Sequence, residues 1–220
     1  MVPYEQNQSF TGRDSFLEEL HNQLQNPNTD QHRGRIALFG LRGIGKTQIT
    51  LEYVYRYQNS YQRIYWISGN TQALLLDGYQ KLGQRAELHI SDLSAVQIAE
   101  RVIAWLESEE SWLLVVNNVD NLTVLSGPQN PNSKFLLLPS TGKSRQNTLI
   151  TTRNRYADGI PAQAKEVEKL GRDASLALLY KFSKITPSDF AEEQAAAIIV
   201  EKLDHLPLAI NQAAAYIREG

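Results

Sequence analysis

The chain has 220 residues, of which 42% are apolar, 22 are basic and 24 are acidic, giving a formal net charge of −2. This length suffices for one large domain, alone or with a small appendage. The absence of cysteine excludes disulfide scaffolds and zinc–thiolate sites, and four widely spaced histidines do not indicate a metal cluster. Interspersed charges, short apolar runs and a polar start argue against nucleic-acid binding, membrane spanning and secretion. We therefore expect a soluble, cytoplasmic protein.

Short apolar runs alternate with longer amphipathic stretches, which is the pattern of a parallel sheet with crossover helices. In chain order, we predict a helix capped by Asp14, a strand at residues 36–39, a helix at 46–58 and a strand at 63–67. There follow a helix capped by Asn70, a helix at 94–107, a strand at 112–116, a loop at 126–133, and strands at 148–152 and 166–170.

The pattern changes after Gly171, where three helices follow one another without a strand between them. They are predicted at residues 173–183, 187–203 and 207–217. The sequence thus predicts an α/β domain at residues 1–170, with a five-stranded and mainly parallel sheet flanked by helices. A small all-helical subdomain is expected at residues 171–220.

A glycine-rich turn between the first predicted strand and the next helix carries the clearest chemical signal. It matches the pattern Gly-x-x-x-x-Gly-Lys-Ser/Thr. Glycines let backbone N–H groups point inward at phosphate oxygens, and the helix N-terminus adds partial positive charge. The lysine of this pattern binds the terminal phosphates, and its Ser/Thr hydroxyl can ligate Mg²⁺. The predicted phosphate loop consists of Gly40, Leu41, Arg42, Gly43, Ile44, Gly45, Lys46 and Thr47.

Such a loop requires an acidic residue at the end of another strand, to hold the metal and position water. The strand at 112–116 is the obvious candidate, but Asn117, Asn118, Val119 and Asp120 follow it. A shift of register that makes Asp120 the metal ligand would extend the strand through two asparagines, which are poor strand formers. We therefore expect Asp120 to cap the short helix that follows.

Six segments, taken together and in their order along the chain, resemble the NB-ARC family. The members of this family are signal-transducing P-loop ATPases of the STAND class. The six segments are residues 2–13, ending in Phe-Thr-Gly-Arg; 45–53, with Gly-Lys-Thr-Gln; 64–67; 112–116; 149–154, Leu-Ile-Thr-Thr-Arg-Asn; and 206–209, Leu-Pro-Leu-Ala. The similarity covers essentially the whole chain and is closest to fungal NLR-like proteins. There the module usually lies between an effector domain and tetratricopeptide repeats.

The resemblance implies roles for residues outside the phosphate loop. Thr11 and Arg13 would lie on the adenine side of the nucleotide, and Arg153 would sense the γ-phosphate. Pro207 and Leu208 would cover the adenine from the helical subdomain, and Gln48 would continue the phosphate site. His205 stands where the family usually has glycine, so the turn before the last helix is expected to differ.

The chain departs from the family in its acidic residues. Family members usually have aspartate at the position of Asn117 and often another acid or asparagine at Asn118. A neutral amide retains a carbonyl oxygen but loses the charge–charge attraction to Mg²⁺. We therefore expect weaker Mg²⁺ binding at Thr47 and slower hydrolysis, with the catalytic positions Lys46, Arg153, Asn117 and Asn118 forming a degenerate set. Nucleotide binding itself should suffer less.

We therefore expect an ADP- and ATP-binding signalling switch of an NLR-like protein of innate immunity, able to form a homo-oligomer when activated. The family's winged-helix domain does not fit after Gly220, so weaker ADP retention is expected. Two alternatives stay open: an active ATPase that uses Asp120 or another acid, and the ATPase domain of a transcription regulator. A small-molecule kinase is disfavoured because no lid or acceptor motif is visible.

Overall fold

The structure is a computed structural model that describes residues 2–26, 34–126, 137–141, 143, 145–155 and 159–219. Its centre is a five-stranded sheet in the order β2-β3-β4-β1-β5, and every neighbouring pair is parallel. This confirms the predicted parallel sheet flanked by helices. The strands are β1 (Arg35–Phe39), β2 (Arg63–Ser68), β3 (Ser111–Asn117), β4 (Arg145–Thr152) and β5 (Gln163–Glu166).

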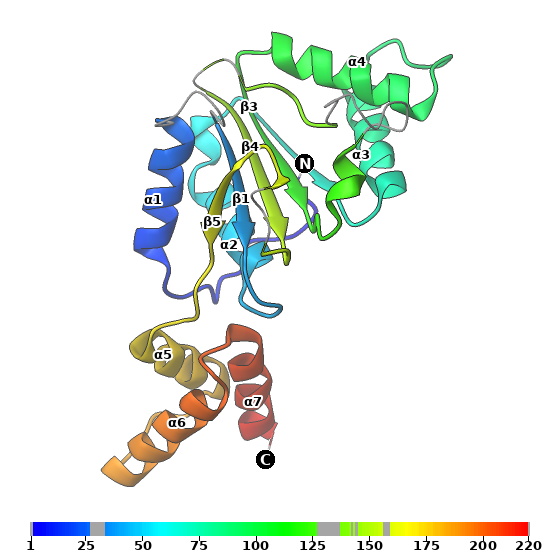
Figure 1. Cartoon of the computed structure of the whole chain (residues 1–220). Coiled ribbons are helices and arrows are strands. Elements are labelled where there is room, and N and C mark those ends of the chain that lie inside the picture. Colours follow the sequence, from blue (N-terminus) through cyan, green and yellow to red (C-terminus); the bar gives the residue numbers. More distant parts are fainter. Residues whose placement is uncertain are drawn as a thin grey trace.

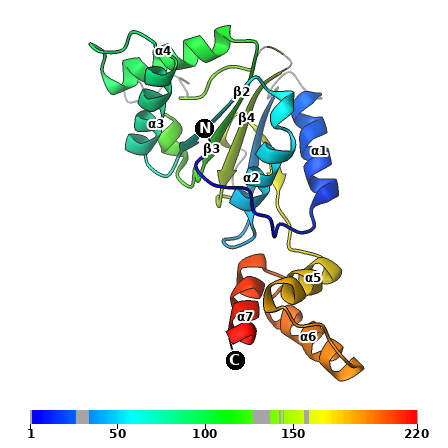
Figure 2. The same cartoon turned by 180° about the vertical axis from the view of Figure 1, so that it is seen from behind.

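Helices cover both faces of the sheet, and three further helices form a separate bundle below it (Figures 1 and 2). α1 (Asp14–Gln25) and α2 (Lys46–Arg56) pack on one face, and α3 (Gln72–Arg85) and α4 (Ala95–Ser108) pack on the other. The bundle consists of α5 (Arg172–Ser183), α6 (Phe190–Lys202) and α7 (Pro207–Glu219). Two short 3₁₀ helices, η2 (Gln58–Ser60) and η3 (Leu122–Leu125), complete the described elements.

The interior strand β3 shows how the two faces are filled. Alternate side chains of a strand point to opposite faces of its sheet. Trp112, Leu114 and Val116 accordingly join the core beneath α3 and α4. Leu113 and Val115 join the core beneath α1 and α2. Burial on both faces is why this strand reads as a continuous apolar run.

Two strands differ from their predicted bounds. β5 lies at Gln163–Glu166, and not at 166–170, because it is an edge strand whose polar residues gave no apolar signal. β4 begins three residues earlier than predicted, at Arg145. Its early residues Gln146 and Asn147 are polar but buried, and their side-chain amides donate to the carbonyls of Glu107 and Leu24. Satisfied amides are allowed in a core, and a hydrophobicity pattern misses them.

Two of the predicted helix caps are wrong. Arg13, in a left-handed conformation, precedes α1, whereas Asp14 lies inside the helix and pairs with Arg56 at 2.6 Å. Thr71 caps α3 by accepting from Leu74 N. The predicted start of α4 at Ser94 is confirmed, since Ser94 forms a capping box with Gln97.

The described helices α5–α7 have a core of their own, separate from those of the sheet. It includes Leu170, Leu178, Val200 and Ile210. Val167, only three residues before Leu170, still belongs to the core beneath α1 and α2. The predicted loop at 126–133 lies, apart from its first residue, outside the described residues. Within the described ranges, no helix has the length and apolar character needed to cross a bilayer.

Candidate functional site

The predicted phosphate loop connects the end of β1 to the start of α2. Gly40, Gly43 and Gly45 all have positive φ angles, of 149°, 81° and 96°. Side chains are disfavoured in these conformations, so the glycines make the bend. The backbone N–H groups of Gly43, Gly45 and Lys46 have no hydrogen-bond acceptor within the described chain. Inward-facing amides at a helix N-terminus form an anion-binding concavity.

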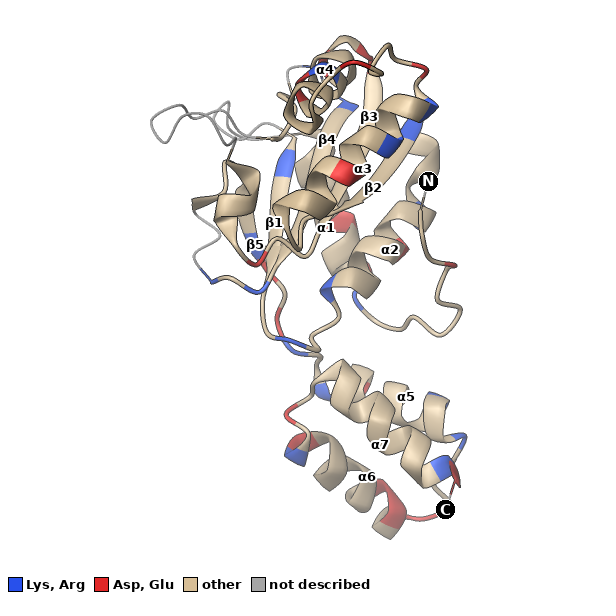
Figure 3. Cartoon of the chain, turned by 90° about the vertical axis from the view of Figure 1, so that its right-hand side faces the viewer, with Lys and Arg blue, Asp and Glu red and all other residues tan. Residues whose placement is uncertain are grey.

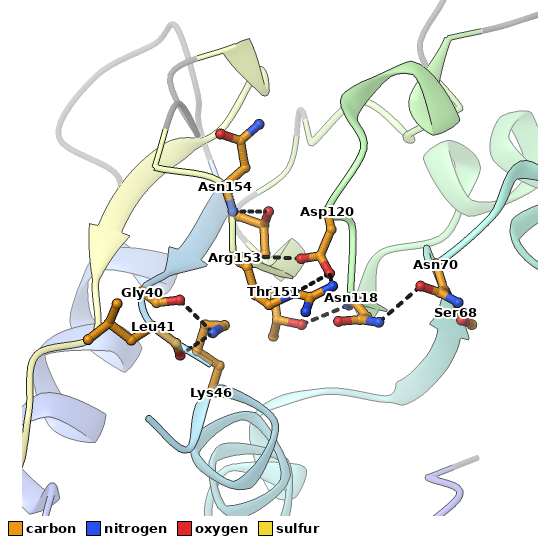
Figure 4. Close-up of polar contacts among 11 residues, drawn as sticks. Gly40, Leu41, Lys46, Ser68, Asn70, Asn118, Asp120, Thr151, Arg153 and Asn154 are labelled. Atoms are coloured by element: carbon orange, nitrogen blue, oxygen red, sulfur yellow. Dashed lines mark hydrogen bonds and ion pairs between the residues drawn. The ribbon is translucent and has the colours of Figure 1, made fainter. Parts of the chain in front are cut away.

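Lys46 folds back over this loop (Figure 4). Its Nζ donates to Gly40 O at 2.8 Å and to Leu41 O at 2.9 Å. Burial lowers the pKa of Lys46, while the nearby charge of Asp120 raises it and that of Arg153 lowers it. The ammonium is thus held at the loop, where it also interacts electrostatically with the ion pair of Asp120 and Arg153.

Asn117, at the end of β3, is joined to the start of α2. Its Oδ1 accepts from Thr47 Oγ1 at 3.2 Å and from Thr151 Oγ1 at 2.8 Å. The end of β3 is therefore next to the phosphate loop. The sequence pattern predicts Thr151 as a strand residue but does not indicate its contact with Asn117.

Asn118 turns away from this contact. It has a φ angle of 70°, in the left-handed region that asparagine tolerates better than most residues. Its backbone N–H donates to Thr151 Oγ1 at 2.8 Å, and its Nδ2 donates to Asn70 Oδ1 at 3.2 Å. Asn70 is therefore a partner of the site and not the helix cap predicted from sequence.

Asp120 forms an ion pair with Arg153 that contains three hydrogen bonds (Figure 4). Its carboxylate accepts from Arg153 N at 2.7 Å, from Nε at 2.6 Å and from Nη2 at 2.5 Å. Burial alone would raise the pKa of Asp120, but these hydrogen bonds outweigh it and hold that pKa below its usual value. The predicted role as a helix cap is wrong, because Asn121 caps η3 by accepting from Thr123 N.

A cavity of about 850 Å³ opens beside the phosphate loop. The loop, the N-terminal segment from Tyr4 to Arg13, and helices α5 and α7 line it. Volumes of this size are typical of small-molecule and cofactor sites. The carbonyl oxygens of Gly40 and Leu41 accept hydrogen bonds from Lys46, and these two residues do not line the cavity. The other predicted nucleotide-binding residues do line it: Thr11, Arg13, Arg42, Gly43, Ile44, Gly45, Lys46, Thr47, Gln48, Pro207 and Leu208.

Arg13 connects the N-terminal segment to the linker before the helical bundle. Its Nη2 donates to the carbonyl oxygen of Glu168. Burial lowers the pKa of Arg13, and the charge of Glu168 opposes that shift. Arg13 Nε is buried without a hydrogen-bond partner in the described chain.

The helical bundle touches the phosphate loop at the start of α7. Leu208 N donates to Gly43 O at 3.2 Å, and a Cβ atom on Gly43 would lie 3.1 Å from Leu208 Cβ. In the turn before α7, His205 adopts a φ angle of 54°, in the left-handed region that favours glycine. His205 Nδ1 lies 3.0 Å from Ser175 Oγ of α5, which holds the histidine within the bundle.

The site fits a nucleotide better than it fits a tightly held metal. For phosphates it offers a lysine, free backbone amides and cavity-lining arginines. For a metal it offers the Thr47 hydroxyl and the Asn117 amide oxygen, which are hydrogen-bonded to each other and carry no charge. The described residues hold no group of three or more His, Cys, Asp or Glu that could bind a metal ion. Mg²⁺ prefers anionic oxygen ligands, so this donor set alone does not suit it.

Comparison with solved structures identifies the fold. The chain aligns over its whole length with 71% of a Walker-type ATPase of Pyrococcus abyssi, at 14% identity and a TM-score of 0.62. It aligns over 95% with Cdc6p of Pyrobaculum aerophilum, at 18% identity and a TM-score of 0.60, covering 61% of that chain. A third match is a STAND protein with a tetratricopeptide repeat sensor from Pyrococcus horikoshii, at 16% identity and a TM-score of 0.53, with 96% and 31% of the two chains covered. Together with the phosphate loop, these matches define the fold of a P-loop NTPase.

Comparison with curated proteins narrows the class. No family model matches the chain. A nucleotide-binding leucine-rich repeat (NLR)-like protein of the fungus Hyaloscypha variabilis is 29% identical over 232 aligned residues, which cover the whole chain. The chain spans 23% of that relative's length. The chain is thus similar in sequence to an NLR-like protein and in fold to a STAND protein, which agrees with the resemblance to the NB-ARC family.

Proposed function

We propose that this chain is the nucleotide-binding switch of an NLR-like protein, and that it binds ADP or ATP with little or no hydrolysis. The observation that supports this most is the shared cavity, whose walls come from the phosphate loop and from helices α5 and α7. A ligand in such a cavity contacts both the sheet part and the helical bundle. Its γ-phosphate can therefore bias how the two are oriented, with a pivot near Gly171.

The proposed roles follow from position. The loop amides and Lys46 bind the phosphates, and Thr11, Arg13, Pro207 and Leu208 enclose the base. The contact of Leu208 N with Gly43 O joins the bundle to the loop, so a nucleotide that moves Gly43 also moves α7. We propose a domain division near residue 170, between the sheet and the bundle.

Weak hydrolysis is the expected result of the amides. Hydrolysis in P-loop enzymes depends on a residue that orients the attacking water and on neutralisation of developing charge. Asn117 carries no charge and its oxygen already accepts two hydroxyl donors. We expect phosphate release by the wild-type chain to match that of a Lys46→Ala variant. A rate well above that background would favour the alternative, an active ATPase that uses Asp120 or another acid.

Direct binding is the first test of the proposal. At about 0.1 mM protein, isothermal titration should detect ADP and ATP even at micromolar affinity. We expect saturable binding of both nucleotides with a stoichiometry of one. The absence of heat and of any thermal stabilisation by either nucleotide would contradict the proposal.

Arg153 is expected to distinguish ATP from ADP. It lines the cavity and is oriented by Asp120, with the Nη1 side of its guanidinium not used by that pair. Arg153→Ala should weaken ATP binding about tenfold and ADP binding much less, because only ATP presents a third phosphate. Arg155→Ala, two residues on and outside the cavity lining, is the matched control. Equal losses for both nucleotides would contradict the sensor role.

The wider context is proposed from the relatives. As an NLR-like protein, the full-length protein would contain an effector domain and tetratricopeptide repeats. It would form a homo-oligomer on activation and act in innate immunity in the cytoplasm. A transcription regulator is the remaining alternative, and a DNA-binding domain adjoining these residues in the full-length protein would favour it.

A further inference from the structure

The cavity has a local excess of positive charge. Its lining includes four basic side chains, Arg13, Arg42, Lys46 and Arg153, and one acidic side chain, Glu5, although the chain as a whole has a net charge of −2. Several basic segments lie where the sheet part meets α5–α7 (Figure 3). A cavity with this lining attracts an anion and stabilises it without help from the rest of the molecule.

Two of these charges are not compensated by acidic partners. Arg153 is paired with Asp120, so this pair contributes little net charge. Lys46 contacts only the carbonyls of the loop. Arg42 is exposed and forms no hydrogen bond or ion pair within the described chain. Lys46 and Arg42 together thus bring two positive charges to the phosphate loop, which equals the charge of one Mg²⁺ ion.

The two oxygens that the resemblance assigns to the metal, Thr47 Oγ1 and Asn117 Oδ1, are both neutral. Asn117 Oδ1 accepts two hydrogen bonds, from Thr47 and Thr151, which fills both of its lone pairs. The carboxylate of Asp120 is held in an ion pair with Arg153, which bonds to both of its oxygens. Thr47 and Asn117 therefore offer a metal no charged ligand, and the nearby carboxylate of Asp120 is already neutralised by Arg153.

We infer that this site binds adenine nucleotides without a divalent cation, the charge of Mg²⁺ being supplied by Arg42 together with Lys46. The inference rests on the proposed function, since it concerns how the same cavity holds its nucleotide. Arg42 is then a binding residue of the phosphate site and not a solvated side chain of a loop. The state of the switch would depend on which nucleotide is present and not on the Mg²⁺ concentration.

Titrations of the intact chain with ADP and ATP, in excess EDTA and in millimolar Mg²⁺, test the inference. We expect the dissociation constants in the two conditions to agree within about threefold. Binding that occurs only with Mg²⁺ would overturn the inference and leave the proposed function intact. Failure to bind in either condition would instead overturn the proposed function, so the two failures are distinguishable.

Arg42→Ala tests the source of the charge. Loss of one cation beside the phosphates should weaken binding in EDTA about tenfold, and Mg²⁺ should restore part of that loss. Arg172→Ala, which removes an exposed arginine of α5 outside the cavity lining, is the control and should change neither value. An Arg42→Ala variant that binds as tightly as the wild type in EDTA would contradict the role of Arg42.

Asn117→Asp should convert the site to a metal-dependent one. The new carboxylate would lie between Thr47 and Thr151, where it repels phosphates unless a cation separates them. We expect affinity in EDTA to fall about tenfold and Mg²⁺ to restore it. Asn121→Asp adds the same charge to an exposed side chain outside the cavity lining, where a carboxylate can still cap η3, and should create no Mg²⁺ dependence. Unchanged affinity of Asn117→Asp in EDTA, or equal Mg²⁺ dependence of both variants, would contradict the assignment, and thermal melts would confirm that each is folded.

Discussion

Replacing Lys46 with alanine is expected to weaken the binding of both ADP and ATP at least about a hundredfold. The Lys46 ammonium lies 2.8 Å from Gly40 O and 2.9 Å from Leu41 O, at the point where the free amides of the loop converge. A phosphate oxygen would replace these carbonyls as its partner and form a stronger, charge-assisted hydrogen bond. Alanine removes that bond, and the remaining amides cannot supply a full charge.

The change is measured by titration calorimetry, with Lys81→Ala as the control. Lys81 is an exposed residue of α3 paired with Asp77 and does not line the cavity. Its loss should leave both affinities unchanged. Thermal melts without nucleotide should show that both variants are folded. A Lys46→Ala variant that retains wild-type affinity would mean that the nucleotide, if bound at all, lies elsewhere.

Gly40→Ala is expected to destabilise the chain by about 2–4 kcal/mol. Gly40 has a φ angle of 149°, which is unfavourable for a residue that carries a side chain. A Cβ atom there would lie 2.8 Å from Val167 O. That oxygen belongs to the backbone, so it cannot move without disturbing the hydrogen bond from Val167 N to Phe39 O. The added methyl group would separate the ends of β1 and β5. The free energy of unfolding in urea measures the effect.

Two glycines serve as matched controls for the separate causes. Gly45 has a φ angle of 96° but no atom within 4 Å of a Cβ, so Gly45→Ala should show backbone strain alone, of about 1–2 kcal/mol. Gly171 has neither a positive φ angle nor a close neighbour, so Gly171→Ala should be close to neutral. If Gly40→Ala costs no more than Gly45→Ala, the clash with Val167 does not determine the stability.

The sheet and most of its helices could be predicted from the sequence because their signals are local. A strand buried on both faces, such as β3, is a continuous apolar run, and the glycine pattern at 40–47 fixes the strand before it and the helix after it. β5 could not be placed, because an edge strand with one polar side needs no apolar run. Its position is set by pairing with β1, which is a tertiary contact.

Interactions between polar side chains were the other unpredictable part. Asp14, Asn70 and Asp120 each have the residue type of a helix cap, yet each is bonded to a residue far away in sequence. The pattern shows which side chains can cap a helix, but a distant arginine or amide can compete for the same oxygen. Residue type alone does not decide that competition.

The site could be predicted as a set of residues, but not as a set of bonds. The motifs identified the loop, Arg13, Arg153 and Leu208, which the structure places around one cavity. The contacts of Asn117 with two threonines and of Asp120 with Arg153 depend on the order of β3 and β4 in the sheet. Strand order is not written in any local pattern, so these contacts required the structure.

The short link between the two buried anchors, Val167 in the sheet core and Leu170 in the bundle core, restricts how the molecule can change shape. Only Glu168 and Lys169 lie between them. The bundle can therefore change its orientation relative to the sheet, but it cannot move far from it. Arg13 binds this link directly, because it donates a hydrogen bond to the carbonyl oxygen of Glu168, and it also lines the cavity. A ligand that attracts the Arg13 guanidinium would therefore also shift the link between the sheet and the helical bundle.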